Sequence, residues 1–218
     1  MKEFKKRIIV SIGLLVAFVL WTIAVCFVDV QAIGPQSSSV GLVTINECVH
    51  NLTGVNFTLY TITDWLGLVP FTVCIGFGVL GFVQLIKRKS LLKVDKSLFI
   101  LGGFYIVVIL VYIFFEGFVI NYRPVLIDNV LEVSYPSSTT MLVMCVMPTT
   151  LFQLNERIKN KVLKYCVSFI IISFTAFMVI GRLISGVHWV TDIIGGALLS
   201  SGLVMMYYSI SAIVSDNN

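Results

Sequence analysis

Long apolar runs alternate along the chain with short polar segments. Six runs, at about 8–28, 65–86, 98–115, 137–154, 165–181 and 193–214, are long enough, or nearly so, to cross a membrane as helices. A hydrocarbon core of about 30 Å takes about 20 helical residues. The fourth and fifth runs are the shortest, and the fourth contains Pro148. The pattern predicts an all-α fold, a six-transmembrane helix bundle in which residues 1–218 form a single membrane-embedded domain.

The longest polar interval, residues 29–64, carries a weaker helical pattern of its own. Its apolar residues Leu42, Ile45, Val49 and Leu52 recur at spacings of 3, 4 and 3, as on one face of a helix. We therefore expect a short external amphipathic helix in this segment. Two placements remain open, one in the membrane interface and the other packed over the mouth of the bundle.

Composition agrees with a membrane protein. Apolar residues make up 58% of the chain and charged residues only 12%, with a mean hydropathy of +1.00, whereas soluble domains carry about 25% charged residues. The first run lacks a clear small-x-small cleavage site and is longer than the apolar core of a signal peptide, which favours a retained helix over a cleaved one.

The basic residues predict the orientation. Thirteen of the fifteen lie in three segments, 2–7, 87–96 and 157–164, that fall on one side of the bundle. Lysine and arginine favour the cytoplasmic side, so the sequence predicts a multi-pass cell-membrane protein with both termini in the cytoplasm. These segments also explain the net charge of +4, and nothing points to a nucleic-acid partner. The two exceptions, Arg123 and Arg182, are expected on the external side.

Three polar patches are predicted on the external side: NYRP at 121–124, YPSSTT at 135–140 and GRLISGVHWVTD at 181–192. Ionisable residues that gather at a membrane edge are costly and indicate a functional site. His188 and Asp192 are four residues apart, so on a helix they share a face. An aspartate in this place fixes the imidazole tautomer and leaves the other ring nitrogen as a nucleophile or base.

The other patches supply groups suited to phosphate. Arg123 and Arg182 together can form a two-guanidinium clamp for phosphate oxygens. Ser137, Ser138 and Thr139 lie where the fourth helix should begin, and a helix start is a ready anion site. These groups indicate phosphoryl transfer, which depends on positioning and on neutralising charge. The simpler alternatives are a capped helix start and a snorkelling arginine. No residues approach a metal-ligand spacing, so no metal or cofactor is expected.

In these residues the chain resembles the type-2 phosphatidic acid phosphatase family, in its six-helix integral membrane branch. The family motifs are K-x6-R-P, P-S-G-H and S-R-x5-H-x3-D, and the resemblance covers the third to sixth runs. It implies that His188 is the nucleophile, Asp192 its supporting carboxylate and Arg182 a phosphate-binding residue. It also implies phosphate-binding roles for Arg123 of the first motif and Ser137 of the second, and chemistry without a metal.

The chain departs from these motifs at four positions. Glu116 stands where the first motif has lysine, and Gly181 where the third has serine. In the second motif Ser138 replaces glycine, and Thr139 replaces the histidine that protonates the leaving group. Glu116 would repel phosphate if it pointed into the site, but it could instead pair with Arg123 or turn away.

The resemblance implies a membrane lipid phosphatase acting at the external leaflet through a phosphohistidine intermediate. Its partner would be a phosphorylated lipid in the bilayer. Without the histidine acid, a lipid diphosphate should be a better substrate than a monophosphate, because phosphate leaves more readily than an alkoxide. His50, the only other histidine, is either a replacement acid or an ordinary loop residue. The alternatives are a non-catalytic phospholipid-binding relative and a lipid phosphotransferase.

Overall fold

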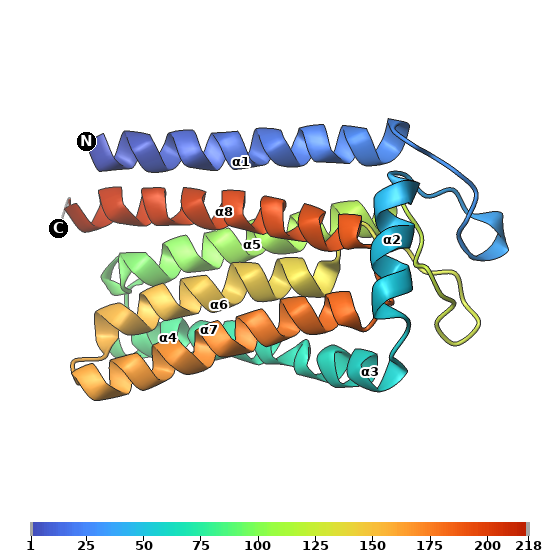
Figure 1. The fold of residues 1–218 in the computed structure, drawn as a ribbon. Helices are drawn as coiled ribbons and strands as arrows, with labels where there is room; N and C mark the ends of the chain where they lie inside the picture. The colour runs from blue at the N-terminus through green and yellow to red at the C-terminus, as the bar shows by residue number, and fades with distance from the viewer. Residues whose placement is uncertain (1, 217–218) are drawn as a thin grey trace.

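The computed structural model describes residues 2–216, which fold as a helical bundle (Figure 1). Six long helices run roughly along one direction, and both ends of the chain lie at the same end of the bundle. In order the elements are α1 (Lys2–Phe27), the 3-10 turn η1 (Pro35–Ser37), α2 (Val43–Thr53), α3 (Phe57–Leu66), α4 (Leu68–Arg88), the 3-10 turn η2 (Leu91–Lys93), α5 (Lys96–Gly117), α6 (Ser138–Arg157), α7 (Lys161–Ile184) and α8 (Val190–Asp216). The expected all-α bundle is confirmed, and each predicted run corresponds to a long helix.

Helix α6 lies at the centre and packs against α4, α5, α7 and α8. By length and composition, five segments of the described chain are apolar enough to cross a membrane: Phe4–Phe27, Phe57–Arg88, Lys96–Gly117, Lys161–Ile184 and Val190–Val214. Helix α6 is not among them because it carries polar side chains such as Thr149 and Gln153, both fully buried. They are paired inside the bundle, for example by the amide of Gln153, which donates to the Tyr207 hydroxyl at 2.6 Å. Neighbouring helices, not its own hydropathy, hold α6 in place.

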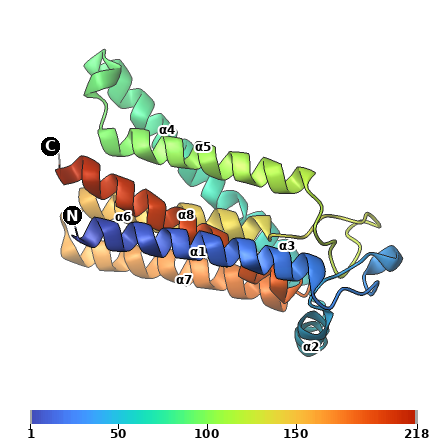
Figure 2. The ribbon, with the colours of Figure 1, turned by 90° about the horizontal axis from the view of Figure 1, so that it is seen from above.

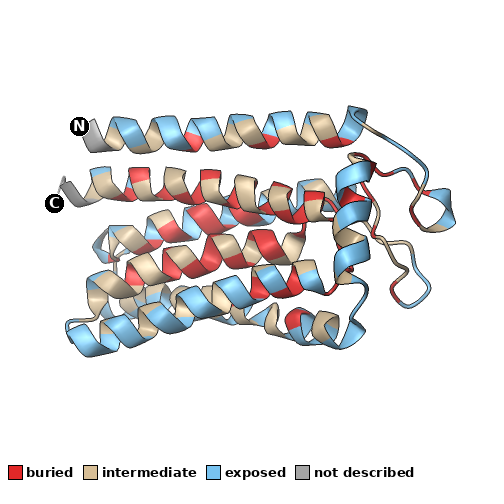
Figure 3. Ribbon diagram, viewed as in Figure 1, coloured by how far each residue is buried: buried red, intermediate tan, exposed pale blue. Residues whose placement is uncertain are grey.

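The bundle surface is apolar, as expected of a protein surrounded by lipid. Figure 3 shows α7 exposed along most of its outer face, and this face carries large apolar side chains such as Phe169 and Ile170. Pro148 does not end α6, which continues to Arg157.

The second span begins earlier than its apolar run indicates. Residues 57–66 form α3, which continues into α4 through Gly67, so the helical segment extends from Phe57 to Arg88. The polar residues of α3 hide it from a hydropathy pattern. Asn56 starts the helix, since its side-chain oxygen accepts the Leu59 backbone N–H at 2.9 Å, a standard N-cap.

The expected short amphipathic helix exists as α2, and it lies across the end of the bundle away from the termini (Figure 1). Its apolar stripe is not what packs against the bundle. Ile45 and Leu52 are exposed, whereas Asn46 is fully buried. The Asn46 side chain accepts the Thr191 backbone N–H at 3.2 Å and donates to the Thr191 hydroxyl at 3.1 Å. These bonds join α2 to the first turn of α8, where backbone N–H groups need partners.

Candidate active site at the end of the bundle

His188 and Asp192 lie at the start of α8, and both side chains are buried. Nδ1 of His188 is 3.5 Å from Oδ2 of Asp192. The same oxygen accepts the backbone N–H of Trp189 at 2.9 Å, so the aspartate also caps the helix from its first turn. Gly186, with a φ of +66°, makes the tight turn before the histidine. The two side chains therefore lie side by side although His188 precedes the helix, so the turn before α8, and not a shared helix face, brings them together.

The surroundings of His188 keep its imidazole neutral. Burial lowers the pKa of His188 well below its usual value, and the guanidinium groups of Arg123 and Arg182 lower it further. Both ring nitrogens are buried without a hydrogen-bond partner among the described residues, although Nδ1 lies 3.5 Å from the Asp192 carboxylate. A neutral imidazole with one nitrogen beside a carboxylate and the other free is the form that can act as a nucleophile.

Arg182 comes from the last turn of α7 and is buried, with a side-chain exposure of 1%. Its Nη1 donates to the Thr63 hydroxyl at 3.4 Å and its Nη2 to Asp64 at 3.5 Å. Asp64 is more than half exposed, so the arginine is only loosely held on that side. Its Nε has no partner among the described residues.

Arg123 lies in the segment between α5 and α6, which folds back on itself. The Arg123 backbone N–H donates to the Glu132 carbonyl at 3.0 Å, and the Ser134 N–H to the Asn121 carbonyl at 2.9 Å. Nε of Arg123 pairs with the Glu132 carboxylate at 2.9 Å, while its Nη1 is buried and has no hydrogen-bond partner among the described residues. The side chains of Asn121 and Ser134 in turn approach the Asp192 carboxylate. This pairing joins the first and third sequence patches in space.

The second patch meets the third through the backbone. Ser137, which is buried, precedes α6, and its N–H donates to the Asp192 carbonyl at 3.0 Å. Its hydroxyl accepts the Thr140 N–H at 3.5 Å as an N-cap. Ser138 and Thr139 are half-buried and line a cavity of about 450 Å³, which is otherwise mostly apolar and is also bordered by Asp64.

Glu116 does not pair with Arg123, because Glu132 occupies that position. Instead Glu116 is exposed and lines a small pocket with Tyr112, Ser134 and Ser138, so it lies beside the second patch. His50, near the end of α2, packs its ring 5.4 Å from that of Trp189. Burial lowers the pKa of His50, and its Nδ1 is buried without a partner in the part of the chain that the structure describes.

The site also includes three residues of α3 that the sequence patterns did not single out, Tyr60, Thr63 and Asp64. All three contact Arg182. Thr63 and Asp64 follow Tyr60 by three and four residues, so on a helix all three side chains share one face. Recognising residues 57–66 as a helix would have revealed this face, but the segment is too polar to stand out beside the apolar runs.

Several polar atoms at this end are buried without hydrogen-bond partners among the described residues: Arg123 Nη1, Arg182 Nε and both ring nitrogens of His188. Buried polar atoms are normally paired, so such a group indicates a place for a polar ligand or water. Over residues 2–216, no three His, Cys, Asp or Glu side chains lie close enough to hold a metal ion.

The fold and the site define a helical membrane protein with buried arginine and histidine side chains gathered at one end of its bundle. The family model for the PAP2 superfamily matches residues 71–214, and the chain belongs to this superfamily. A crystal structure of a transmembrane PAP2-type phosphatidylglycerolphosphate phosphatase from Bacillus subtilis shares the fold, with a TM-score of 0.62 and 17% sequence identity. The similarity covers 94% of this chain and 96% of that one. Among curated proteins, none matches the sequence. Family and fold together support a lipid phosphatase.

Proposed function

We propose that the chain hydrolyses a lipid phosphate or diphosphate at the external leaflet, through a phosphohistidine formed on His188 and without a metal ion. The observation that carries this proposal is the convergence of a neutral His188 with two buried guanidinium groups, Arg123 and Arg182. Both arginines lower the pKa of His188, so their charges act on the same small region.

In the proposed reaction, Nε2 of His188 attacks phosphorus while Nδ1 faces Asp192. The N–P bond forms as the bond from phosphorus to the leaving oxygen breaks. Arg123 and Arg182 bind the phosphoryl oxygens and stabilise the charge that develops on them, with Ser137, Ser138 and Thr139 beside the start of α6. Water then attacks the phosphohistidine and releases phosphate.

The leaving group determines which substrates this site can process. Thr139 stands where family members carry the proton-donating histidine, and general acid help is worth about 10²–10⁴-fold. When His188 attacks the terminal phosphorus of a lipid diphosphate, the leaving group is the lipid monophosphate, which needs little protonation, so lipid diphosphates are the substrate class we propose. Glu116 forms no ion pair with either arginine among the described residues, and it lines a small pocket with Tyr112 and Ser138.

A phosphoenzyme assay tests the proposal. Protein incubated with ³²P-labelled lipid diphosphate should carry acid-labile label, and His188→Ala should carry none. His50→Ala is the matched control and should retain the label, because the His50 ring packs against Trp189 and not against His188. Absence of label and of phosphate release from the wild type would favour a non-catalytic lipid-binding protein. Label that passes to added acceptor alcohols would identify a phosphotransferase.

A further inference from the structure

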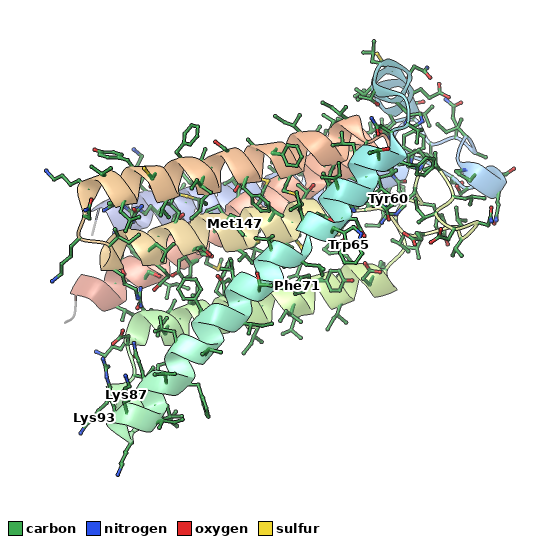
Figure 4. The ribbon with its side chains drawn as sticks, turned by 90° about the horizontal axis from the view of Figure 1, so that it is seen from below. Tyr60, Trp65, Phe71, Lys87, Lys93 and Met147 are labelled. Carbon is green, nitrogen blue, oxygen red and sulfur yellow. The ribbon has the colours of Figure 1, made fainter. Side chains whose placement is uncertain are left out.

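Tyr60 of α3 is the aromatic residue against which both arginines lie. Cζ of Arg182 is 5.0 Å from the centre of the Tyr60 ring, and Cζ of Arg123 is 5.7 Å from it. Figure 4 shows Tyr60 on α3 at one end of the bundle, with Lys87 and Lys93 at the opposite end. The two arginines come from segments far apart in the sequence, and one aromatic ring contacts both.

Two buried guanidinium groups that converge on one site repel each other. Each has its own carboxylate partner, Glu132 for Arg123 and Asp64 for Arg182, and neither carboxylate is shared between them. The face of an aromatic ring attracts cations within about 6 Å, and guanidinium groups stack on it. A ring also adds no negative charge, so it can hold both cations without repelling a phosphate.

The local structure fixes Tyr60 in this place. The Asn56 backbone N–H donates to the Ser185 carbonyl at 2.9 Å, which ties the start of α3 to the turn that follows Arg182. One turn after Tyr60, Thr63 approaches α7 closely. A Cβ added to Gly181 of α7 would lie 2.9 Å from the methyl carbon of Thr63. The glycine that replaces the family serine at 181 thus allows α3 to approach the site.

We propose that Tyr60 is a positioning residue that holds Arg123 and Arg182 together as one clamp for a phosphate group. This inference rests on the proposed function of the site and adds a residue to it. Tyr60 precedes residues 71–214, the part of the chain that matches the family, so it belongs to none of the three sequence motifs. The phosphate group that this clamp binds belongs to a lipid headgroup or to free inorganic phosphate.

Phosphate binding by the purified full-length protein tests the inference. Calorimetric titration with inorganic phosphate should show an affinity at least about tenfold lower for Tyr60→Leu, and unchanged within about twofold for Tyr60→Phe, which keeps the ring. Trp65→Leu is the control on the same helix, where the side chain is 70% exposed, and it should bind as the wild type does. In lipid hydrolysis, Tyr60→Leu should also raise KM and the inhibition constant of phosphate, and Tyr60→Phe should restore both.

Each outcome separates the inference from the proposed function. Wild-type hydrolysis with undiminished phosphate binding by Tyr60→Leu would overturn the inference alone, as would equal losses in the Leu and Phe variants, which assign the effect to the hydroxyl. Phosphate binding that depends on the ring, without any phosphohistidine, would overturn the proposed function alone. A wild type that binds no phosphate would overturn the inference alone if the phosphohistidine still forms, and both proposals if it does not.

Should Tyr60→Leu fail to fold, a fluorinated series replaces it. Phenylalanine analogues with one, two and three ring fluorines keep the shape of the ring while they weaken its attraction for cations. Phosphate affinity should fall stepwise along the series at constant thermal stability. A constant affinity across the series would overturn the inference.

Discussion

At the residue scale, the site is a small number of charged groups whose properties are set by burial. His188, Asp192 and Arg182 are all nearly inaccessible to solvent, where charges interact more strongly than in water. The polar atoms without partners, among them His188 Nε2 and Arg123 Nη1, face the same end of the bundle.

The first prediction is a pH dependence. Burial and the two arginines lower the pKa of His188, and the neutral imidazole is the reactive form. Activity should therefore persist as the pH falls through 6.5, the ordinary value for histidine, and decline only at lower pH. The rate of phosphoenzyme formation, measured from pH 4 to 8 in a single turnover, reports directly the pH at which activity declines on the acid side. An acid limb at or above pH 6.5 would contradict the assignment.

The second prediction concerns the leaving group. Because Thr139 cannot donate a proton as an imidazolium does, the wild type should hydrolyse a polyprenyl diphosphate at least about 10²-fold faster than a phosphatidate. Thr139→His should narrow this ratio by raising monophosphate hydrolysis, with Thr139→Ser as the control of similar size. Paired assays of kcat/KM in detergent measure the ratio. A wild type that prefers the monophosphate would refute the argument from the missing acid.

At the element scale, the segment before α6 must press against α8 for the three patches to meet. Tyr135 is buried there, with its hydroxyl 2.7 Å from that of Thr22 on α1. Gly195 of α8 faces this ring directly, since a Cβ added to it would lie 2.7 to 2.8 Å from three atoms of Tyr135. A glycine in α8 thus determines how close Ser137 comes to Asp192.

Gly195→Ala should therefore destabilise the protein. The added methyl group forces the ring aside, and such overpacking costs about 1–3 kcal/mol. Gly103→Ala in α5 is the control, because nothing lies within 4 Å of the added carbon there. Replacing a helical glycine at an open position should be neutral or stabilising by up to about 1 kcal/mol. Thermal unfolding in detergent compares the two variants, and equal midpoints would contradict the packing argument.

At the scale of the whole molecule, charge separates the two ends of the bundle. Thirteen of the fifteen basic residues lie in the segments 2–7, 87–96 and 157–164, whereas Arg123 and Arg182 lie at the end occupied by α2 and α3. Figure 2 shows α4 and α5 standing apart from the other long helices over part of their length. The distribution of lysine supports cytoplasmic termini and an external site.

Cysteine labelling tests this orientation. Cys48 on α2 is exposed and should react with a membrane-impermeant maleimide in intact cells, with the signal lost in Cys48→Ser. Lys89→Cys, placed in the Cys48→Ser background, should react only after the membrane is permeabilised. The reverse pattern would show that the site faces the cytoplasm.

The sequence could predict those features that depend on neighbours along the chain. Apolar runs longer than about 17 residues must lie in lipid or in a core, so all six long helices were predictable. The i, i+4 spacing placed His188 beside Asp192, and the two external arginines drew attention because they break the charge rule. The family motifs then connected these groups to a single site.

Only the tertiary structure decided which residues from distant segments share that site. Glu132, not Glu116, pairs with Arg123, because the segment between α5 and α6 folds back on itself. Asn46, not the apolar stripe of α2, is buried against α8, because the backbone at a helix start needs partners. Tyr60 joins both arginines although it belongs to no motif. Sequence periodicity encodes contacts within one helix, but contacts between helices depend on packing in three dimensions, which periodicity does not contain.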